Sequence, residues 1–189
     1  LIKSEAAYGK PFGDARVLNL GSGILEGVSP VSEQLKKVLE INNVKIASFV
    51  AVDRAASNSV SKGITYRKAD IFGFLKRLKP PFPNIVVLKR VLEHLADYER
   101  PAVLRLCWSK LPEGGFFFTD FLIMAGQPIG SGGPASVILR KINGRPELVY
   151  LNLGTVAARF KGLNRSQMAK KIQAEYADAS EPIVGIIAP

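Results

Sequence analysis

Residues Ala15 to Gly27, ARVLNLGSGILEG, decide the fold of this chain. The run from Arg16 to Leu20 is typical of a short buried strand, and it leads directly into Gly21-Ser22-Gly23. A helical pattern follows from about Ser29. A strand that ends in closely spaced glycines before a helix lets the backbone approach a ligand where a side chain would block it. The helix N-terminus adds oriented N–H groups. The stretch therefore predicts a ligand-binding turn, with a plain turn as the alternative.

Length and composition indicate one globular domain covering residues 1–189. The chain is 47% hydrophobic and 22% charged, which is ordinary for a soluble protein with a sizeable core. No apolar run approaches the roughly 20 residues of a membrane-spanning helix, and the first residues lack the order of a signal peptide. We therefore expect a cytoplasmic protein without a membrane span.

The chain has one cysteine, Cys107, and one histidine, His94. A single cysteine cannot form an internal disulfide or a cysteine-based zinc site, so we expect no metal centre. Cys107 falls within a helical pattern and is expected to be a buried thiol.

The net charge is +10, and its distribution is uneven. Residues 62–90 contain eight basic residues and one acid, and residues 140–171 contain another eight with one acid. Such segments can form an electrostatic footprint for nucleic acid, anionic lipid or an acidic partner. The alternative is a basic surface that is merely solvated.

Apolar strands alternate with helical patterns through the first two thirds of the chain. The expected strands are 16–20, 45–53, 64–70, 84–89 and 116–123, and the expected helices are 29–41, 71–78 and 92–110. Pro101 is expected to start a second helix within the last of these. Strands that are apolar on both faces and alternate with helices predict a doubly wound α/β fold, with helices on both faces of a mostly parallel sheet.

The two ends of the chain lack the regular alternation of strands and helices that the middle part shows. Residues 1–14 are expected to be a lead-in segment, and residues 125–145 a flexible loop or substrate region whose glycine-rich part, 125–134, is either a lid or a crossover loop. A strand at 147–153, a helix from Asn164 or Ser166 to Tyr176 and a strand at 183–188 are expected to follow. The last would make an antiparallel C-terminal edge of a seven-stranded sheet.

Polar residues follow four of the expected strands. They are Asn19 to Gly23, Asp53, Asp70, and Lys89 to His94. Ligands of open α/β sheets bind at the carboxyl ends of the strands, so these residues should converge on one crevice. A carboxylate after the second strand can accept hydrogen bonds from a ribose diol, and one after the third can accept from the amine of adenine. As solitary residues, Asp53 and Asp70 would more often form turns or helix caps.

The order VLNLGSG, FVAVD, KADIF, IVVLKRVLEHL and LPEGGFFFTDF resembles the class I S-adenosylmethionine-dependent methyltransferases over about residues 14–125. The resemblance implies that the cofactor is S-adenosylmethionine. The cofactor-binding positions that it implies are Asn19, Gly21, Ser22, Gly23, Asp53, Arg54, Asp70, Ile71, Lys89 and Arg90. Gly21 and Gly23 would approach the methionyl part, Asp53 would hold the ribose, and Asp70 with Ile71 would border the adenine.

Two departures from the family pattern concern the glycine turn. Asn19 stands where the family usually has an acid, and Leu25 stands where it usually has a third glycine. The amide of Asn19 keeps an acceptor oxygen but loses the charge that would favour a cationic ligand. These departures leave a non-catalytic, methyltransferase-like module in a larger assembly as an alternative.

The resemblance also implies a floor between cofactor and acceptor that is formed by Lys89, Arg90, Val91, Glu93 and His94. His94 is the candidate general base, because a histidine can accept a proton near neutral pH; packing at the start of the next helix is its alternative role. Lys89 and Arg90 could receive an anionic acceptor such as a carboxylate or phosphate.

Three nucleic-acid methylation chemistries lack their family motifs here. Enzymes that methylate the amines of nucleobases carry an Asp/Asn-Pro-Pro-aromatic motif after the fourth strand, whereas Lys79-Pro80-Pro81-Phe82 precedes that strand here. Methylation of a cytosine carbon needs a nucleophilic cysteine, whereas Cys107 falls in the middle of an expected helix. The enzymes that methylate the cap ribose have an Asp after the fourth strand, where this chain has Lys89-Arg90. We therefore expect a methyltransferase acting on a small-molecule, lipid or saccharide acceptor. An RNA methyltransferase that uses the basic surface is an alternative.

Overall fold

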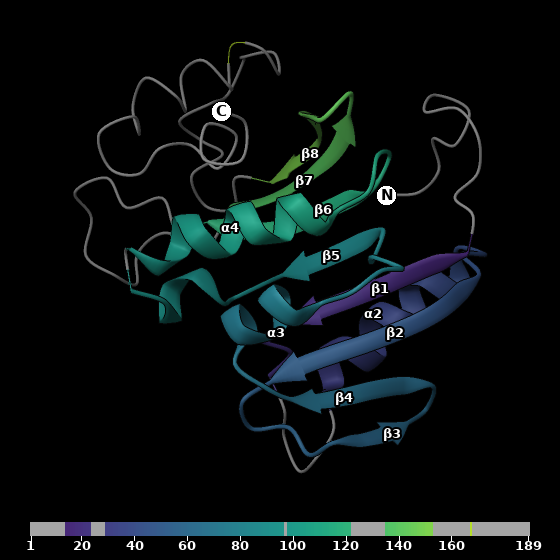
Figure 1. Ribbon diagram of the computed structural model, residues 1–189. Coiled ribbons are helices and arrows are strands. Elements are labelled where there is room, and N and C mark those ends of the chain that lie inside the picture. Colours follow the sequence, from purple (N-terminus) through teal and green to yellow (C-terminus); the bar gives the residue numbers. More distant parts are fainter. Residues whose placement is uncertain (1–13, 24–28, 97, 122–134, 153–166, 168–189) are drawn as a thin grey trace.

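The structure is a computed structural model, and it describes residues 14–23, 29–96, 98–121, 135–152 and Gln167 (Figure 1). Within this part of the chain, eight strands form a single sheet. They are β1 Ala15–Leu20, β2 Ile46–Asp53, β3 Ser59–Ser61, β4 Ile64–Lys68, β5 Ile85–Leu88, β6 Phe116–Phe121, β7 Ala135–Ile142 and β8 Arg145–Asn152. The helices are α2 Pro30–Ile41, α3 Ile71–Arg77, the 3-10 helix η1 Leu92–His94 and α4 Glu99–Lys110.

The sheet has the strand order β3-β4-β2-β1-β5-β6-β7-β8. The five strands from β4 to β6 in this order run parallel to one another, whereas β3 pairs antiparallel with β4, β7 with β6, and β8 with β7. The chain reverses its direction of winding at β1, which pairs with both β2 and β5. The carboxyl ends of these strands therefore meet at one edge, and the predicted α/β fold with a mostly parallel sheet is confirmed.

Helices cover both faces of the sheet. Successive side chains of a strand point to opposite sides, so one strand contributes to the core on each face. On β1, Leu18 and Leu20 belong to the core beneath α3 and α4, while Ala15 and Val17 belong to the core that includes Leu39 of α2. Figure 1 shows α3 and α4 on one face and α2 on the other. The prediction of helices on both faces is thereby confirmed.

The antiparallel part of the sheet differs from the prediction. The described residues form eight strands where we expected seven, and β7 occupies most of residues 135–145, the second half of the region 125–145 that we expected to be a flexible loop or substrate region. A two-residue hairpin turn joins β7 to β8 at Asn143 and Gly144, with φ values of 52° and 73°. Two positive φ values are what such a turn requires, and Asn-Gly supplies them at little cost. The short strand β3 was also not expected.

The expected helix 92–110 is divided into η1 and α4. The second helix begins at Glu99 instead of Pro101, which becomes its third residue. Proline fits there because the first four N–H groups of a helix have no partner within it. The expected helix at 164–176 (apart from Gln167), the expected strand at 183–188, the segment 1–13 and the loop 125–134 lie outside the described residues.

Two further expectations concern burial and membranes. Cys107 lies on the buried side of α4 and is fully buried, as expected, and this burial raises the pKa of its thiol far above the ordinary range. None of the helices that the structure describes has the length and apolar character needed to cross a membrane.

Adjacent residues of α2 test how the helix is held on the sheet. Leu39 is 6% exposed and Val38 is 46% exposed. We expect Leu39→Ala to lower the free energy of unfolding by about 2–5 kcal/mol, because it removes buried methyl groups and leaves a cavity. Val38→Ala should change it by less than about 0.5 kcal/mol. Urea denaturation of both variants measures the difference, and equal losses would contradict this packing.

Candidate functional site

The glycine turn after β1 brings the backbone against the end of β5. Gly21 has a φ of 63°, and its N–H donates to the carbonyl oxygen of Val52 at 2.8 Å. A Cβ atom at Gly21 would lie 2.3 Å from Cγ2 of Val91, which no side chain can do. At Gly23, with a φ of 62°, an added Cβ would meet only open space. The first glycine therefore serves packing, and the second faces the opening above the sheet.

A buried polar network supports this turn from below. The Ser29 hydroxyl caps α2 by accepting from the Ser32 N–H at 3.1 Å, and it donates to the carbonyl oxygen of Ser22. The amide of Asn19 donates to the Ser32 hydroxyl at 2.8 Å. Asn19 and Ser22 are each only 2% exposed. Both residues, which we expected to bind cofactor, join the glycine turn to α2, Asn19 through its side chain and Ser22 through its carbonyl oxygen.

Asp53 ends β2 and bridges two turns. One carboxylate oxygen accepts from the Gly23 N–H at 3.0 Å, and the other accepts from the Ala55 N–H at 2.9 Å. Each oxygen retains a further lone pair, so the same carboxylate can accept from a ligand hydroxyl. Asp53 thus fixes the second glycine in place and offers acceptors beside it.

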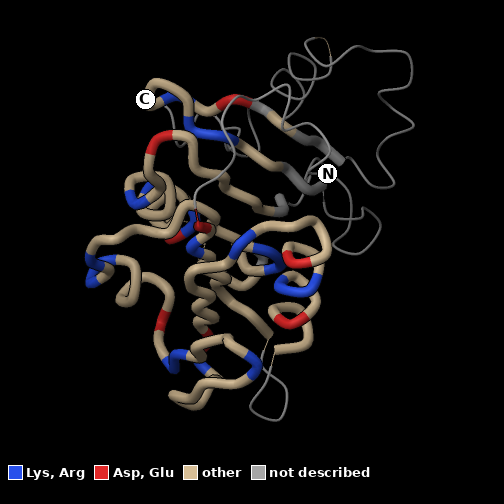
Figure 2. The backbone as a smooth tube through the Cα atoms, turned by 90° about the vertical axis from the view of Figure 1, so that its right-hand side faces the viewer, with Lys and Arg blue, Asp and Glu red and all other residues tan. Residues whose placement is uncertain are grey.

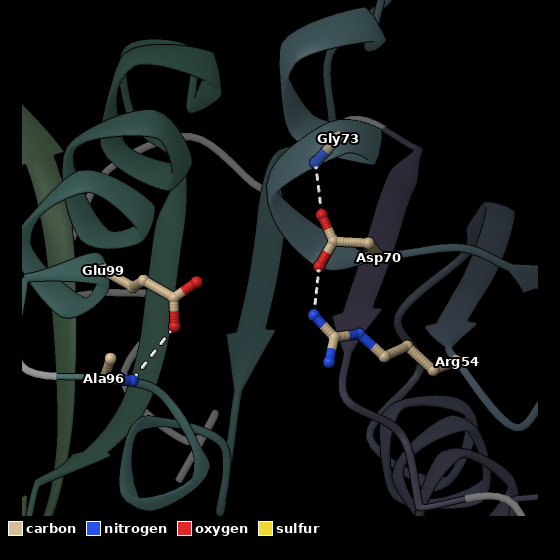
Figure 3. Close-up of polar contacts among 5 residues, drawn as sticks. All are labelled: Arg54, Asp70, Gly73, Ala96 and Glu99. Carbon is tan, nitrogen blue, oxygen red and sulfur yellow. Dashed lines mark hydrogen bonds and ion pairs between the residues drawn. The ribbon is translucent and has the colours of Figure 1, made fainter.

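Asp70 and Arg54 form an ion pair at the rim of the site (Figure 3). One oxygen of Asp70 caps α3 by accepting from the Gly73 N–H at 2.8 Å, and the other accepts from the Arg54 guanidinium at 2.7 Å. The Gly73 N–H and then the guanidinium lower the pKa of the Asp70 carboxyl, and the carboxylate raises the pKa of Arg54. Asp70 is therefore both a helix cap and an acceptor at the rim.

Glu99 forms part of the opposite wall. Its carboxylate accepts from the Ala96 N–H at 3.0 Å, which fixes the start of α4. Figure 3 shows this side chain on the α4 side, facing the Arg54–Asp70 pair on the α3 side. Glu99 was not expected in the site, although an acid in the first turn of a helix is a usual capping signal.

These groups surround a cleft of about 310 Å³ at the carboxyl edge of the sheet. It is lined by Gly21, Gly23, Asp53, Arg54, Asp70, Ile71, Phe72, Arg90, Val91, His94, Leu95, Glu99 and Val103. Most of the expected site residues therefore converge. The exceptions are Asn19, Ser22 and Lys89, which are not in the lining, and Glu93, whose side chain is outside the described part.

Lys89 lies away from the cleft, although we expected it there. Its ammonium lies 5.9 Å from the centre of the Phe118 ring on β6. Its neighbour Arg90 is in the lining and has a φ of 57°. A non-glycine residue in the left-handed region is uncommon and costs about 1–3 kcal/mol. The backbone turns at Arg90, so the two adjacent cations point to different places.

The apolar part of the lining was largely missed by sequence reasoning. Phe72, Leu95 and Val103 come from α3, from the segment after η1 and from α4. Apolar residues in helices fit an ordinary core pattern, so nothing in the sequence marks them as lining a cleft. The result is a cleft with apolar walls, carboxylates near the glycine turn, and Arg90 and His94 in the segment that follows β5.

Comparisons with known proteins give structural neighbours but no sequence relatives. No family model matches the sequence, and no curated protein matches it. The structure is similar to an S-adenosylmethionine-dependent methyltransferase from Archaeoglobus fulgidus, with 19% identity, a TM-score of 0.42, and coverage of 63% of this chain and 49% of that chain.

Two further neighbours are methyltransferases. N-methyltransferase NodS from Bradyrhizobium japonicum WM9, solved with S-adenosyl-L-homocysteine, has 17% identity and a TM-score of 0.41, covering 57% of this chain and 53% of that chain. An O-methyltransferase family protein from Burkholderia thailandensis has 13% identity and a TM-score of 0.46, covering 62% and 36%. The chain thus spans about a third to a half of the length of these three structures.

The two glycines of the turn should respond differently to substitution. Gly23→Ala should lower the free energy of unfolding by about 1–2 kcal/mol, because alanine disfavours the left-handed region. Gly21→Ala should cost about 1–3 kcal/mol more, because the added methyl overlaps Val91. Denaturation of both variants, and of Gly21→Ala combined with Val91→Ala, measures the overlap. The double variant should recover part of the loss, and purely additive losses would contradict the close approach.

The cap of α3 should show a pH dependence that Asp70→Asn removes. Asparagine keeps a capping oxygen but has no charge, so we expect a loss of about 0.5–1 kcal/mol at neutral pH, as for an exposed ion pair. The folded-state pKa of Asp70 is lowered, so its contribution is present above the unfolded pKa of about 3.9 and is lost as the pH falls through the folded value.

Denaturation from pH 7 to pH 2 tests this expectation. The difference in unfolding free energy between the two proteins should close below about pH 4. Arg54→Gln serves as the control, because it removes the ion pair and leaves the charged cap in place. A difference that stays constant over the whole range would contradict the assigned role of the Asp70 charge.

Proposed function

We propose that this chain binds S-adenosylmethionine in the cleft and transfers its methyl group. The observation that supports the proposal most strongly is the convergence of Gly23, Asp53 and Asp70, from three separate strand ends, on one cleft. The sequence motifs that resemble the methyltransferases supply these same residues. The resemblance therefore rests on positions that are adjacent in space as well as ordered in the sequence.

The residues present fit an adenosyl group. Gly23 leaves open space where a side chain would stand, and the Asp53 carboxylate beside it offers acceptor oxygens for hydroxyl groups. Ile71 and Phe72 supply apolar surface next to the Asp70 carboxylate, which suits a flat ring carrying an amine. When bound, the cofactor would supply an electrophilic methyl group on a sulfonium.

Most of the acceleration would come from positioning the acceptor. Alignment of two reacting groups contributes roughly 7–11 kcal/mol in well-oriented systems. His94, at the end of η1 and in the cleft lining, would accept a proton from an acceptor hydroxyl. Arg90 would orient a carboxylate or phosphate of the acceptor. The walls formed by Leu95 and Val103 would exclude water from this end of the cleft.

The proposed acceptor is a small molecule, a lipid or a saccharide. This choice rests on the absence of the three nucleic-acid methylation motifs from the sequence, and on a cleft of about 310 Å³ whose walls are partly apolar. We propose that Lys89, which lies outside the lining, takes no part in the chemistry.

Calorimetric titration with S-adenosylmethionine and S-adenosyl-L-homocysteine tests the proposal. We expect both to bind the unmodified chain, and Asp53→Ala to weaken binding at least tenfold, because it removes a charged acceptor worth about 1.5–3 kcal/mol. Asp14→Ala is the matched control, since Asp14 precedes β1 at the opposite edge of the sheet and pairs with Lys45.

The controls separate a lost ligand contact from a lost fold. Thermal unfolding without ligand should show that Asp53→Ala remains folded, and Asp53→Asn, which keeps one acceptor oxygen, should bind with intermediate affinity. No binding to the unmodified chain at millimolar concentrations would reject the proposed cofactor. Unchanged affinity in Asp53→Ala would reject the assigned site.

A further inference from the structure

We propose that the outer face of α3 and α4 binds single-stranded nucleic acid. Its cationic part, called here the basic patch, consists of Lys76, Arg77 and Lys79 at the end of α3. Its aromatic part is Tyr98, at the start of α4. This surface is outside the cleft, and the proposal does not depend on the cofactor or on methyl transfer.

Cations on the two sides of the sheet have different partners. Near α2, the ammonium groups of Lys36, Lys45 and Lys62 each form an ion pair with a carboxylate. The three residues of the basic patch are exposed, and none forms an ion pair within the described part of the chain. The charges of these three lysines are therefore compensated, although Lys37 of α2 is exposed and forms no ion pair within the described part; all three charges of the basic patch are without a carboxylate partner there.

Aromatic rings and backbone carbonyls hold the cations here, in place of carboxylates. The ammonium of Lys76 lies 4.3 Å from the centre of the Phe72 ring. On α4, Lys110 lies 5.0 Å from the centre of the Phe82 ring and donates to the carbonyl oxygen of Leu78 at 3.4 Å. The contact between Lys110 and Leu78 brings the last turn of α4 beside the basic patch.

The carboxylates of this face lie at the other ends of the helices. Asp70 caps the start of α3, and Glu99 binds the Ala96 N–H at the start of α4. At the far ends of these helices, away from the cleft, Lys76, Arg77 and Lys110 therefore have no acid of α3 or α4 beside them, whereas the cleft combines its three acids with Arg54 and Arg90. Figure 2 is viewed from the edge of the sheet opposite the cleft and shows Lys and Arg in blue on that side. A row of phosphates is the partner that such a segregated positive surface complements.

The exposed apolar residues argue for nucleic acid over a membrane or an apolar protein surface. Binding in a membrane interface needs large apolar side chains next to the cations. In the described residues the exposed large aliphatic side chains are Val31, Val38 and Ile41 of α2 and Val60 of β3. None of them belongs to α3 or α4, so the basic patch has no apolar anchor beside it.

Tyr98 supplies the feature that favours a single strand. Tyr98 is 81% exposed, and it is the one aromatic residue among the exposed large hydrophobic residues of the described part. Proteins that bind single strands combine cations along the backbone with rings on which bases stack. Tyr98 and Lys110 lie at opposite ends of α4, about 18 Å apart along a helix of this length. A strand lying along α4 could place a base on Tyr98 and its phosphates on the basic patch.

Fluorescence anisotropy with a labelled single-stranded RNA tests the role of the basic patch. The first variant carries Lys76→Gln, Arg77→Gln and Lys79→Gln, and the matched control carries Lys36→Gln, Lys45→Gln and Lys62→Gln. Both lose three positive charges. We expect the first to lose at least tenfold in affinity at about 0.1 M salt and its salt slope to fall by about two, while the control stays within about threefold. Equal losses in both would overturn the proposal, since net charge alone would explain them.

Tyr98→Ala tests whether bases are stacked. It leaves the charge unchanged, so we expect about tenfold weaker binding of RNA and unchanged binding of heparin, a polyanion without bases. Equal affinity for RNA in Tyr98→Ala would overturn the assignment to single strands. Binding to phosphatidylserine vesicles without binding to RNA would overturn it in favour of a membrane.

A last measurement separates this proposal from the proposed function. Asp53→Ala should keep its affinity for RNA, and the basic-patch variant should keep its affinity for S-adenosyl-L-homocysteine. If the chain binds RNA at the basic patch but no cofactor, the nucleic-acid surface stands and the methyltransferase proposal fails. The opposite result would retain the cofactor site and reject the surface.

Discussion

The close approach of Gly21 to Val91 is the constraint on which the site depends. It requires a residue without a Cβ atom, in a left-handed conformation, at the point where β1 ends beside β5. The hydrogen bond from the Gly21 N–H to Val52 adds the end of β2 to the same contact. Three strand ends are thereby held at fixed positions, and the floor of the cleft follows from them. A bulkier turn would separate β1 from β5 and change the shape of the floor.

The carboxylates of the cleft have structural roles as well as ligand-facing ones. Asp53 holds the N–H groups of Gly23 and Ala55, and Asp70 holds the first turn of α3. A carboxylate can do both, because each oxygen has two lone pairs. The turn and the helix caps are therefore fixed before any ligand binds. Their conformational entropy is lost on folding, so binding does not lose it again. Asp53 and Asp70 can therefore form a turn or a cap and also face a ligand, so the two roles considered for them from the sequence do not exclude each other.

Sequence patterns predicted the parallel part of the fold well because its signals are local. Each buried strand is a short apolar run, and the polar residues at its carboxyl end mark the site. The strand β8 was expected at 147–153, but β7 and the hairpin turn that joins it to β8 were missed, although Asn143-Gly144 is a strong turn signal, because the glycine-rich residues before β7 suggested a loop. That Arg90 lines the cleft and Lys89 does not could not be predicted, because the difference depends on the left-handed backbone at Arg90. The positions of Phe72 and Val103 in the cleft lining could not be predicted either, since lining a cleft and filling a core need the same residue types.

The burial and the hydrogen bond of Asn19 explain why a neutral side chain suits this position. Its side chain does not line the cleft; it is 2% exposed and donates an amide hydrogen to the Ser32 hydroxyl at the start of α2. An unpaired carboxylate at this depth would carry a desolvation penalty and would have no hydrogen to donate. Asparagine therefore suits a neutral network in which Ser29 and Ser32 already connect the helix to the turn. The departure from the family pattern changes how the turn is supported from below, and it leaves Gly23, Asp53 and Asp70 in place at the cleft.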